Sequence, residues 1–310
     1  MSSKVIVLGG SGMLGSMVTD VLSRDPDIEL TATVRSETLT DQCRAHLSSV
    51  RWVLFDAEAA DLDAALRVID GHEWVINTIG LTKPYIHEES SFEVERAIRV
   101  NALLPHRLAR RAEACGARVL QPATDGVFSG AKGHYVETDP HDAFDVYGKT
   151  KSLGEVISLN VSHLRCSVIG PEPKSYGFLV EWFRSQPPDA RINGYVNHLW
   201  NGVTTFHFAR ICLGIIRVNL PLPSLQHVIP DDDVSKADIL RLLSTAYGRT
   251  DVSIHDVEAE RAGNFLLRTN DEALNRSIWE AAGYERPLTV AEMIPGMARH
   301  DCRLEGLVNG

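Results

Sequence analysis

The stretch that decides the fold is "KVIVLGGSGMLGSMVTDVL", residues 4–22, because it joins a short apolar run to a helical pattern through a G-x-x-G-x-x-G pattern formed by Gly9, Gly12 and Gly15. Apolar residues recur at helical spacing after the first glycines. Glycine permits a tight turn, lets backbone N–H groups approach a pyrophosphate, and allows the helix to pack closely on the strand, with its N-terminus facing the anion. The stretch therefore predicts a dinucleotide-binding strand–loop–helix unit. Its predicted cofactor contacts are Gly9, Gly12, Met13, Leu14 and Gly15.

Apolar, β-branched runs alternate with helical patterns through the rest of the first half. The further predicted strands are residues 28–35, 50–56, 73–80, 117–123 and 163–170. A long helix is predicted over residues 91–116, with Gly116 as its C-cap. Alternation of this kind is typical of parallel βαβ units, so we predict an α/β fold with a doubly wound parallel sheet of the Rossmann type.

After about residue 170 the elements become shorter, and Pro and Gly become frequent. We therefore predict a Rossmann domain over residues 1–168. A smaller α+β domain, mainly substrate-binding, is predicted over residues 169–310, and its segments can interleave with the first domain.

The ends of the second, third and fourth strands refine the cofactor. An NAD-specific site usually places Asp or Glu about 20 residues after the loop, whereas here the second strand ends in Arg35. A guanidinium suits the 2′-phosphate of NADPH, so NADPH is favoured and NADH stays an alternative. The alternative for Arg35 is an arginine that ends a strand in solvent. Asp56 ends the third strand, where it could bind an adenine amino group or cap a helix. The other predicted cofactor contacts are Ala57, Thr78, Ile79 and Gly80.

Tyr147 and Lys151, in "VYGKTKSLGE" (residues 146–155), lie four residues apart on one face of a predicted helix. A free tyrosine titrates at about 10, and a neighbouring ammonium group favours the phenolate, which brings the group closer to acid–base work at neutral pH. The lysine also suits the hydroxyls of a nicotinamide ribose. The spacing alone arises often by chance. Thr124, however, ends the fifth strand, where its hydroxyl could bind a substrate carbonyl oxygen or cap the next turn.

Composition narrows the class of protein. The chain of 310 residues has 44% hydrophobic residues and a formal charge of -10, which argues against a general nucleic-acid binder. No apolar run reaches the roughly 18 residues of a membrane span, and the N-terminus lacks the apolar core of a signal peptide. The five cysteines show no disulfide framework, and the histidines show no metal-ligand spacing. We therefore expect a cytoplasmic protein without a metal and without nucleic-acid or membrane partners.

Together these motifs resemble the extended short-chain dehydrogenases/reductases, and within them the dTDP-4-dehydrorhamnose reductase family. The resemblance covers at least the first two-thirds of the chain, through "VLGGSGMLG", "NTIG", "RVNALLPHRLA", "TDGVFSG", "YGKTKSLGE", "LRCSVIG" and "WNGVTT". It implies that Thr124, Tyr147 and Lys151 are catalytic, the last two also contacting the cofactor. It further implies that Asn101 supports the active site and its cofactor from the long helix. The chain departs from the family at Gly126, where an aromatic residue is common.

The resemblance implies NADPH-dependent reduction of a nucleotide-linked 4-keto-6-deoxy sugar in sugar-nucleotide or polysaccharide biosynthesis. Related dehydratases typically carry T-D-E after the fifth strand, whereas this chain has T-D-G, so elimination is disfavoured. In the reduction, hydride passes to the carbonyl carbon and Tyr147 protonates the oxygen. A sugar-nucleotide epimerase and a non-catalytic NADP-binding regulatory subunit remain alternatives.

The predicted partner is a nucleotide sugar, which the second domain would select. The predicted substrate contacts are Thr124, Asp125, Lys83, Trp200 and Asn201. Trp200 and Asn201 lie in "RINGYVNHLWNGVTT", which resembles the segment that contacts the sugar nucleotide in this superfamily. Core packing is the alternative for Trp200, and a solvated loop position is the alternative for Lys83. A homodimer stays open.

Overall fold

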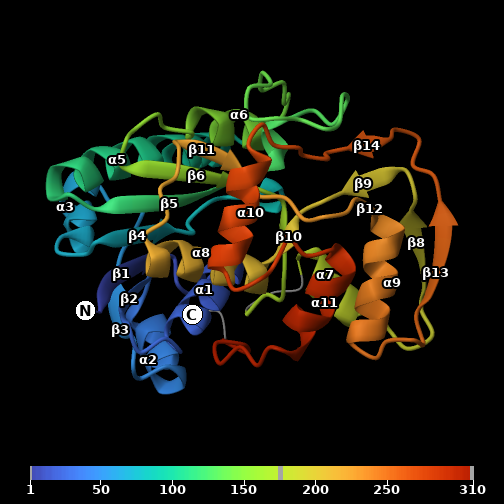
Figure 1. Cartoon of the computed structure of the whole chain (residues 1–310), viewed down its shortest axis with the longest axis horizontal. Coiled ribbons are helices and arrows are strands. Elements are labelled where there is room, and N and C mark those ends of the chain that lie inside the picture. The colour runs from blue at the N-terminus through green and yellow to red at the C-terminus, as the bar shows by residue number, and fades with distance from the viewer. Residues whose placement is uncertain (1, 174–176, 308–310) are drawn as a thin grey trace.

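The main sheet of the protein has seven parallel strands (Figure 1). The structure is a computed structural model that describes residues 2–173 and 177–307. From one edge of the sheet to the other, the strands are β11 (Leu225–His227), β6 (Val161–Arg165), β5 (Arg118–Ala123), β4 (Trp74–Asn77), β1 (Ser3–Leu8), β2 (Ile28–Val34) and β3 (Arg51–Leu54). The order places β1 inside the sheet, with later strands added on both sides of it. The predicted doubly wound parallel sheet is confirmed.

Helices cover both faces of this sheet. One face carries α1 (Met13–Leu22), α2 (Glu37–His46) and α8 (Thr205–Val218). The other face carries α3 (Leu62–Ala65), the 3-10 helix η1 (Leu66–Ile69) and α5 (Leu104–Cys115). In β1, Val5 and Val7 belong to the first core, whereas Ile6 and Leu8 belong to the second. This alternation follows because successive side chains of a strand point to opposite faces.

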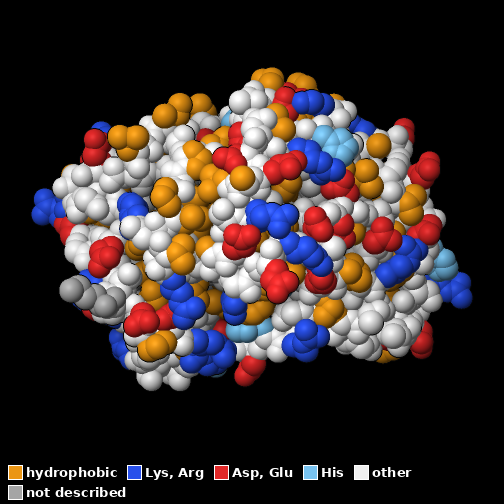
Figure 2. Space-filling model, in the orientation of Figure 1, with side chains coloured by type: hydrophobic (Ala, Val, Ile, Leu, Met, Phe, Trp, Pro, Cys, Tyr) orange, Lys and Arg blue, Asp and Glu red, His pale blue; other side chains and the backbone are white. Residues whose placement is uncertain are grey.

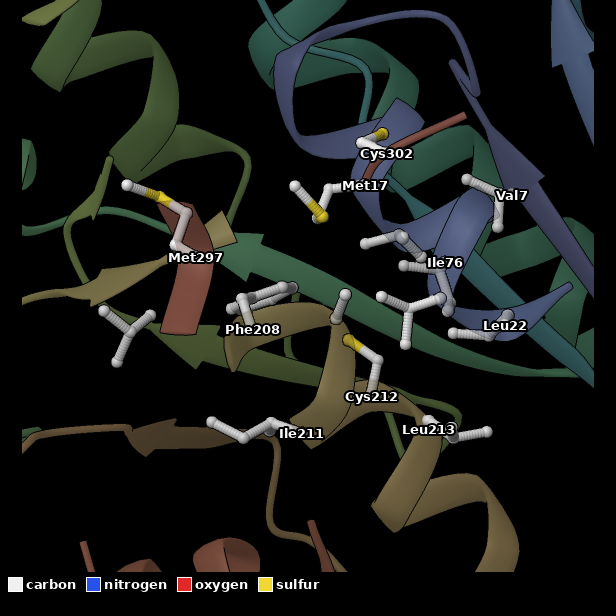
Figure 3. Packing of buried hydrophobic residues seen from close by; sticks show 14 of the residues in the cluster. Val7, Met17, Leu22, Ile76, Phe208, Ile211, Cys212, Leu213, Met297 and Cys302 are labelled. Carbon is white, nitrogen blue, oxygen red and sulfur yellow. The ribbon is translucent and has the colours of Figure 1, made fainter. Parts of the chain in front are cut away.

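The first core joins the two halves of the chain. Figure 3 shows one apolar cluster built from the sheet, from α1, from α8 and from α11 (Val290–Arg299). Its members in that view include Val7, Met17, Ile76, Phe208, Ile211, Cys212 and Met297. β11 and α8, which come after residue 168, thus complete the main sheet and its cover.

The remaining elements of the second half form a smaller part beside the sheet (Figure 1). Its paired strands are β7 (Val168–Ile169) with β10 (Val203–Thr204), β8 (Arg191–Tyr195) with β13 (Ser253–Val257), and β9 (His198–Trp200) between β12 (Val234–Ser235) and β14 (Gly263–Asn264). Its helices include α7 (Leu179–Arg184) and α9 (Lys236–Ala246), whereas α10 (Glu272–Ala281) packs on α8 beside the main sheet (Figure 1).

The long helix predicted over residues 91–116 is interrupted. It consists of α4 (Ser91–Ala97), a π-helical turn η3 (Ile98–Leu103) and α5, which ends at Gly116 with a φ of 74°. Pro105 has no N–H to donate to the carbonyl of Asn101, so the regular ladder cannot pass this point. That carbonyl oxygen instead faces Gly154, where a Cβ atom would lie 2.0 Å away.

A buried arginine ties β6 to β11 and to the segments on either side of the helix that carries the predicted catalytic pair. Arg165 has no exposed area. It donates to Glu155 Oε1 at 3.2 Å, and to the ring Nε2 atoms of His141 at 2.7 Å and His227 at 2.8 Å. Its guanidinium carbon also lies 5.2 Å from the centroid of the Phe128 ring. We call these five residues the Arg165 network.

The surface carries charges of both signs. Figure 2 shows Asp and Glu side chains interspersed with Lys and Arg over the face drawn there. Within residues 2–173 and 177–307, none of the helices has the length and apolar character needed to span a lipid bilayer.

Candidate active site

A cavity of about 610 Å³ lies at the carboxyl ends of the parallel strands. Ligands bind at this edge in open α/β sheets. Twelve of the predicted cofactor contacts line it, namely Gly9, Gly12, Met13, Leu14, Arg35, Asp56, Ala57, Thr78, Ile79, Gly80, Tyr147 and Lys151. The sheet therefore brings together residues that are far apart in the sequence.

The glycine loop forms one wall of this cavity. Gly9 has a φ of 83°, a conformation that favours glycine, and its N–H donates to Thr33 Oγ1 at 2.9 Å. Gly12 leads into α1 without a side-chain cap, so the first turn of the helix faces the cavity with its backbone groups. Gly15 has a different role: it is buried, and a Cβ atom there would lie 2.1 Å from the Gly9 carbonyl oxygen. It allows the helix to pack against the loop.

Arg35 and Asp56 lie at the next two strand ends. Arg35 is exposed and makes no hydrogen bond or ion pair with another described residue. Asp56 Oδ1 accepts a hydrogen bond from the Glu58 N–H at 2.9 Å. The following helix α3 is capped by Asp61, not by Asp56. The alternative of a helix N-cap at Asp56 is therefore wrong.

Tyr147 and Lys151 lie on α6 (Val146–Leu153), which begins at the N-cap Asp145. The phenol of Tyr147 is hydrogen-bonded to the side chain of Thr124. Burial raises the pKa of Tyr147 to about 12; the Thr124 hydrogen bond opposes this rise, and the carboxylates of Asp125 and Asp145 add to it. The expected lowering of this pKa by the neighbouring lysine is absent. The phenol is protonated at neutral pH.

Lys151 points toward the floor of the cavity. Its Nζ lies 3.5 Å from the Pro122 carbonyl oxygen and 4.0 Å from the position a Cβ atom would take at Gly80. Burial lowers the pKa of Lys151, and the Glu155 carboxylate opposes that shift. The ammonium group is thus placed beside the cavity at the ends of β4 and β5.

Thr124 caps the turn after β5, which is one of the two roles expected of it, while its contact with a substrate carbonyl oxygen stays a prediction. Its Oγ1 accepts from the Gly126 N–H at 3.0 Å, capping the turn after β5, and donates to Asp125 Oδ1 at 3.2 Å. Burial raises the pKa of Asp125, while hydrogen bonds from Thr124 and Ser167 oppose the rise. Asp125 therefore lies next to the Thr124–Tyr147 pair.

Gly126 explains the departure from the family pattern. A Cβ atom at this position would lie 2.9 Å from Cε1 of Tyr147 and 3.3 Å from Oγ1 of Thr124. The missing side chain lets the tyrosine ring lie directly on the turn. The acid that a dehydratase would carry here has no place in this packing.

Lys83 lies close to the same tyrosine. Its Nζ is 2.7 Å from Asp145 Oδ2 and 5.8 Å from the centroid of the Tyr147 ring. The lysine is half exposed, and its ion pair joins the loop after β4 to the start of α6. Its contact with a substrate stays a prediction.

Asn101 supports the site from outside the cavity. It is buried in the π-helical turn, where its Oδ1 accepts from the Leu81 N–H at 2.8 Å. Its Nδ2 donates to the Leu81 carbonyl at 2.9 Å and to Thr150 Oγ1 at 3.2 Å. The side chain thus holds the loop after β4 against the catalytic helix, which is consistent with the supporting role implied by the resemblance.

Trp200 and Asn201 do not line the cavity. Trp200 is 7% exposed and belongs to the first core, so the structure agrees with the alternative of core packing. Asn201 is 3% exposed, and its amide group pairs with the backbone of Leu267 through hydrogen bonds of 2.8 and 2.9 Å. Because these groups are used internally, neither residue is part of the candidate site.

Several residues that the sequence did not mark also line the cavity. They include Phe55, Glu58, Tyr85, Arg96, Gln121 and Phe178. Phe55 and Glu58 lie within two residues of Asp56, so the predicted end of the third strand could have indicated that they line the cavity. Arg96 and Val100 lie four residues apart in one continuous helical run, which marks a shared face but no chemistry.

A glycine loop on a parallel sheet, with a Tyr-x-x-x-Lys helix beside the same cavity, defines the short-chain dehydrogenase/reductase class of Rossmann-fold proteins. Within this class the chain belongs to the family described as "RmlD substrate binding domain", whose model matches residues 3–169. The resemblance inferred from the motifs is thereby confirmed.

Relatives and solved structures agree with this assignment. A dTDP-4-dehydrorhamnose reductase from Streptomyces griseus is 32% identical over 157 residues, which are 50% of this chain and 45% of that protein. The chain thus spans somewhat less than half the length of this relative in the match. A dTDP-4-dehydrorhamnose reductase from Bacillus anthracis, solved with NADP, has a TM-score of 0.69 at 17% identity, covering 96% of this chain and 99% of that one. A UDP-glucuronic acid 4-epimerase from Bacillus cereus has a TM-score of 0.71 at 13% identity, covering 95% and 98%. At these identities the two structures show the shared fold.

Proposed function

We propose that this protein reduces the 4-keto group of a nucleotide-linked 4-keto-6-deoxy sugar with NADPH. The observation that carries the proposal is the hydrogen-bonded Thr124–Tyr147 pair beside the cavity that Lys151 lines. The name of the Streptomyces griseus relative supports this reaction over others on the same fold. The cytoplasmic location and the homodimer stay predictions.

The cavity fits a dinucleotide. Because Gly15 has no Cβ atom, α1 packs closely against the glycine loop. The backbone N–H groups of the loop and of the first helical turn can then bind a pyrophosphate. Arg35, exposed and without a partner among the described residues, would bind the 2′-phosphate. Lys151 would bind the nicotinamide ribose. When bound there, NADPH supplies the hydride that reduces the carbonyl carbon.

The side chains of the site supply and position the proton. Tyr147 donates its phenolic proton to the carbonyl oxygen as that oxygen gains charge. Its pKa of about 12 in the free protein keeps the proton in place until substrate binds. The Thr124 hydroxyl orients the oxygen toward the phenol, and the Lys151 ammonium stabilises the phenolate that remains.

The direct test measures NADPH consumption with a panel of 4-keto sugar nucleotides. Tyr147→Phe keeps the ring that packs on Gly126 but removes the proton, so we expect kcat to fall by roughly 10²- to 10⁴-fold while the variant still binds NADPH. Tyr195→Phe, at a tyrosine on β8 outside the cavity, is the matched control and should keep full activity.

Three outcomes would contradict the proposal. Full activity in Tyr147→Phe would remove the assigned proton donor. Tight NADPH binding by the wild type without turnover of any sugar would favour the regulatory subunit. Interconversion of sugar epimers without net consumption of NADPH would favour the epimerase.

A further inference from the structure

An ion pair between Glu58 and Arg96 forms part of the cavity wall beside Asp56. We infer that this pair is the surface on which the adenine ring of the dinucleotide stacks, an inference that rests on the proposed function. The two residues come from different elements, since Glu58 follows β3 and Arg96 lies in α4. The pair thus bridges the two sides of the adenosine end.

The geometry of the pair is bidentate. Arg96 Nε lies 2.9 Å from Glu58 Oε1 and 2.8 Å from Oε2, and its Nη2 lies 2.8 Å from Oε2. The two side chains are 30% and 31% exposed, so the pair is half-buried and still reaches the cavity. A guanidinium held in this way has a fixed plane, and planar guanidinium groups stack on aromatic rings and bases.

The position of Glu58 is fixed from the strand side. Its N–H donates to Asp56 Oδ1, so the residue predicted to bind the adenine amino group also orients the turn that carries Glu58. Val100, four residues after Arg96, adds an apolar side chain to the same wall. A planar cation, a nearby carboxylate and an apolar side chain in one wall together suit a purine.

The pair also separates the roles of the two arginines in the cavity. The charge of Arg96 is already matched by Glu58, so it has little left for a 2′-phosphate. Arg35 has no carboxylate partner among the described residues, and its charge is available. Arg96 should therefore serve the adenine ring, which NADPH and NADH share, and Arg35 should serve the phosphate, which only NADPH carries.

The test measures dissociation constants of NADPH and NADH by fluorescence titration. Arg96→Gln should raise both constants by the same factor, roughly three- to tenfold, because stacking does not involve the phosphate. Arg96→Lys keeps the positive charge but loses the planar guanidinium group, so it should also raise both dissociation constants by the same factor. Arg99→Gln, which removes an exposed arginine one turn further along that pairs with Glu95, is the matched control and should change neither constant.

The melting temperature of each variant shows whether its fold is intact. Glu58→Gln, which loosens the pair without shortening either side chain, should raise both constants by a smaller factor. Unchanged constants in folded Arg96→Gln would overturn the inference, and so would a rise confined to NADPH, which would make Arg96 a phosphate ligand. A wild-type protein that binds neither dinucleotide would instead overturn the proposed function, and the inference with it.

Discussion

Polar side chains have opposite surroundings in two regions of this molecule. At the cofactor cavity, Arg35 is exposed and unpaired among the described residues, and Asp56 is exposed. In the Arg165 network, a fully buried guanidinium is matched by Glu155 and two histidines. The first arrangement keeps charges available for a ligand, and the second uses them to hold the chain together. Mutations should therefore change binding in the first region and stability in the second.

The largest effect is expected at the centre of the network. Arg165→Met leaves the carboxylate of Glu155, whose side chain is 11% exposed, without its cation. Breaking a buried pair on one side should lower the free energy of unfolding by about 3–5 kcal/mol, which urea denaturation measures. Arg286→Met, which breaks an exposed pair with Glu292, is the control and should cost less than about 1 kcal/mol. Equal losses in both variants would remove the contrast.

The next effect is a dependence of stability on pH. Burial lowers the pKa of His227 to about 4, with the Arg165 charge adding to the shift, whereas the residue titrates at about 6.5 in an unfolded chain. Between these values the unfolded chain binds more protons, so stability is complete above pH 6.5 and falls as the pH drops toward 4. His227→Gln should reduce this loss by up to about 3 kcal/mol in urea denaturation at several pH values. If the free energy of unfolding of His227→Gln depended on pH as in the wild type, a group other than His227 would be responsible for the loss.

The smallest effect is expected at the cofactor cavity. Arg35→Gln removes a charge that binds nothing in the protein itself, so the melting temperature should not change. The dissociation constant of NADPH should rise about tenfold, since a hydrogen bond to a charged group is lost, while that of NADH should stay within about twofold. Arg44→Gln, at an exposed arginine on the adjacent helix α2, is the control. An equal loss for both dinucleotides would contradict the role of Arg35.

The sequence predicted the sheet and most of the cavity because both depend on local signals. Glycine spacing, strand ends and the Tyr147–Lys151 spacing can be read within a few residues of each other. Trp200 and Asn201 could not be judged in this way, since their burial depends on segments that are distant in the sequence, such as β12, which pairs with Trp200, and the segment that holds Leu267. The ion pair between Arg96 and Glu58 could not be predicted for the same reason, because 38 residues separate its two members.

The chain returns to the main sheet after residue 169, and this limits which of its segments can be exchanged with those of a relative. The family match ends at residue 169, yet α8 and β11, which cover and extend the sheet, come later. A fragment cut at that boundary would expose the apolar face that Phe208 and Cys212 fill in Figure 3. An exchange of segments is therefore better confined to β8 and β13 than extended to everything after residue 169, because these two strands form a two-stranded sheet separate from the main sheet.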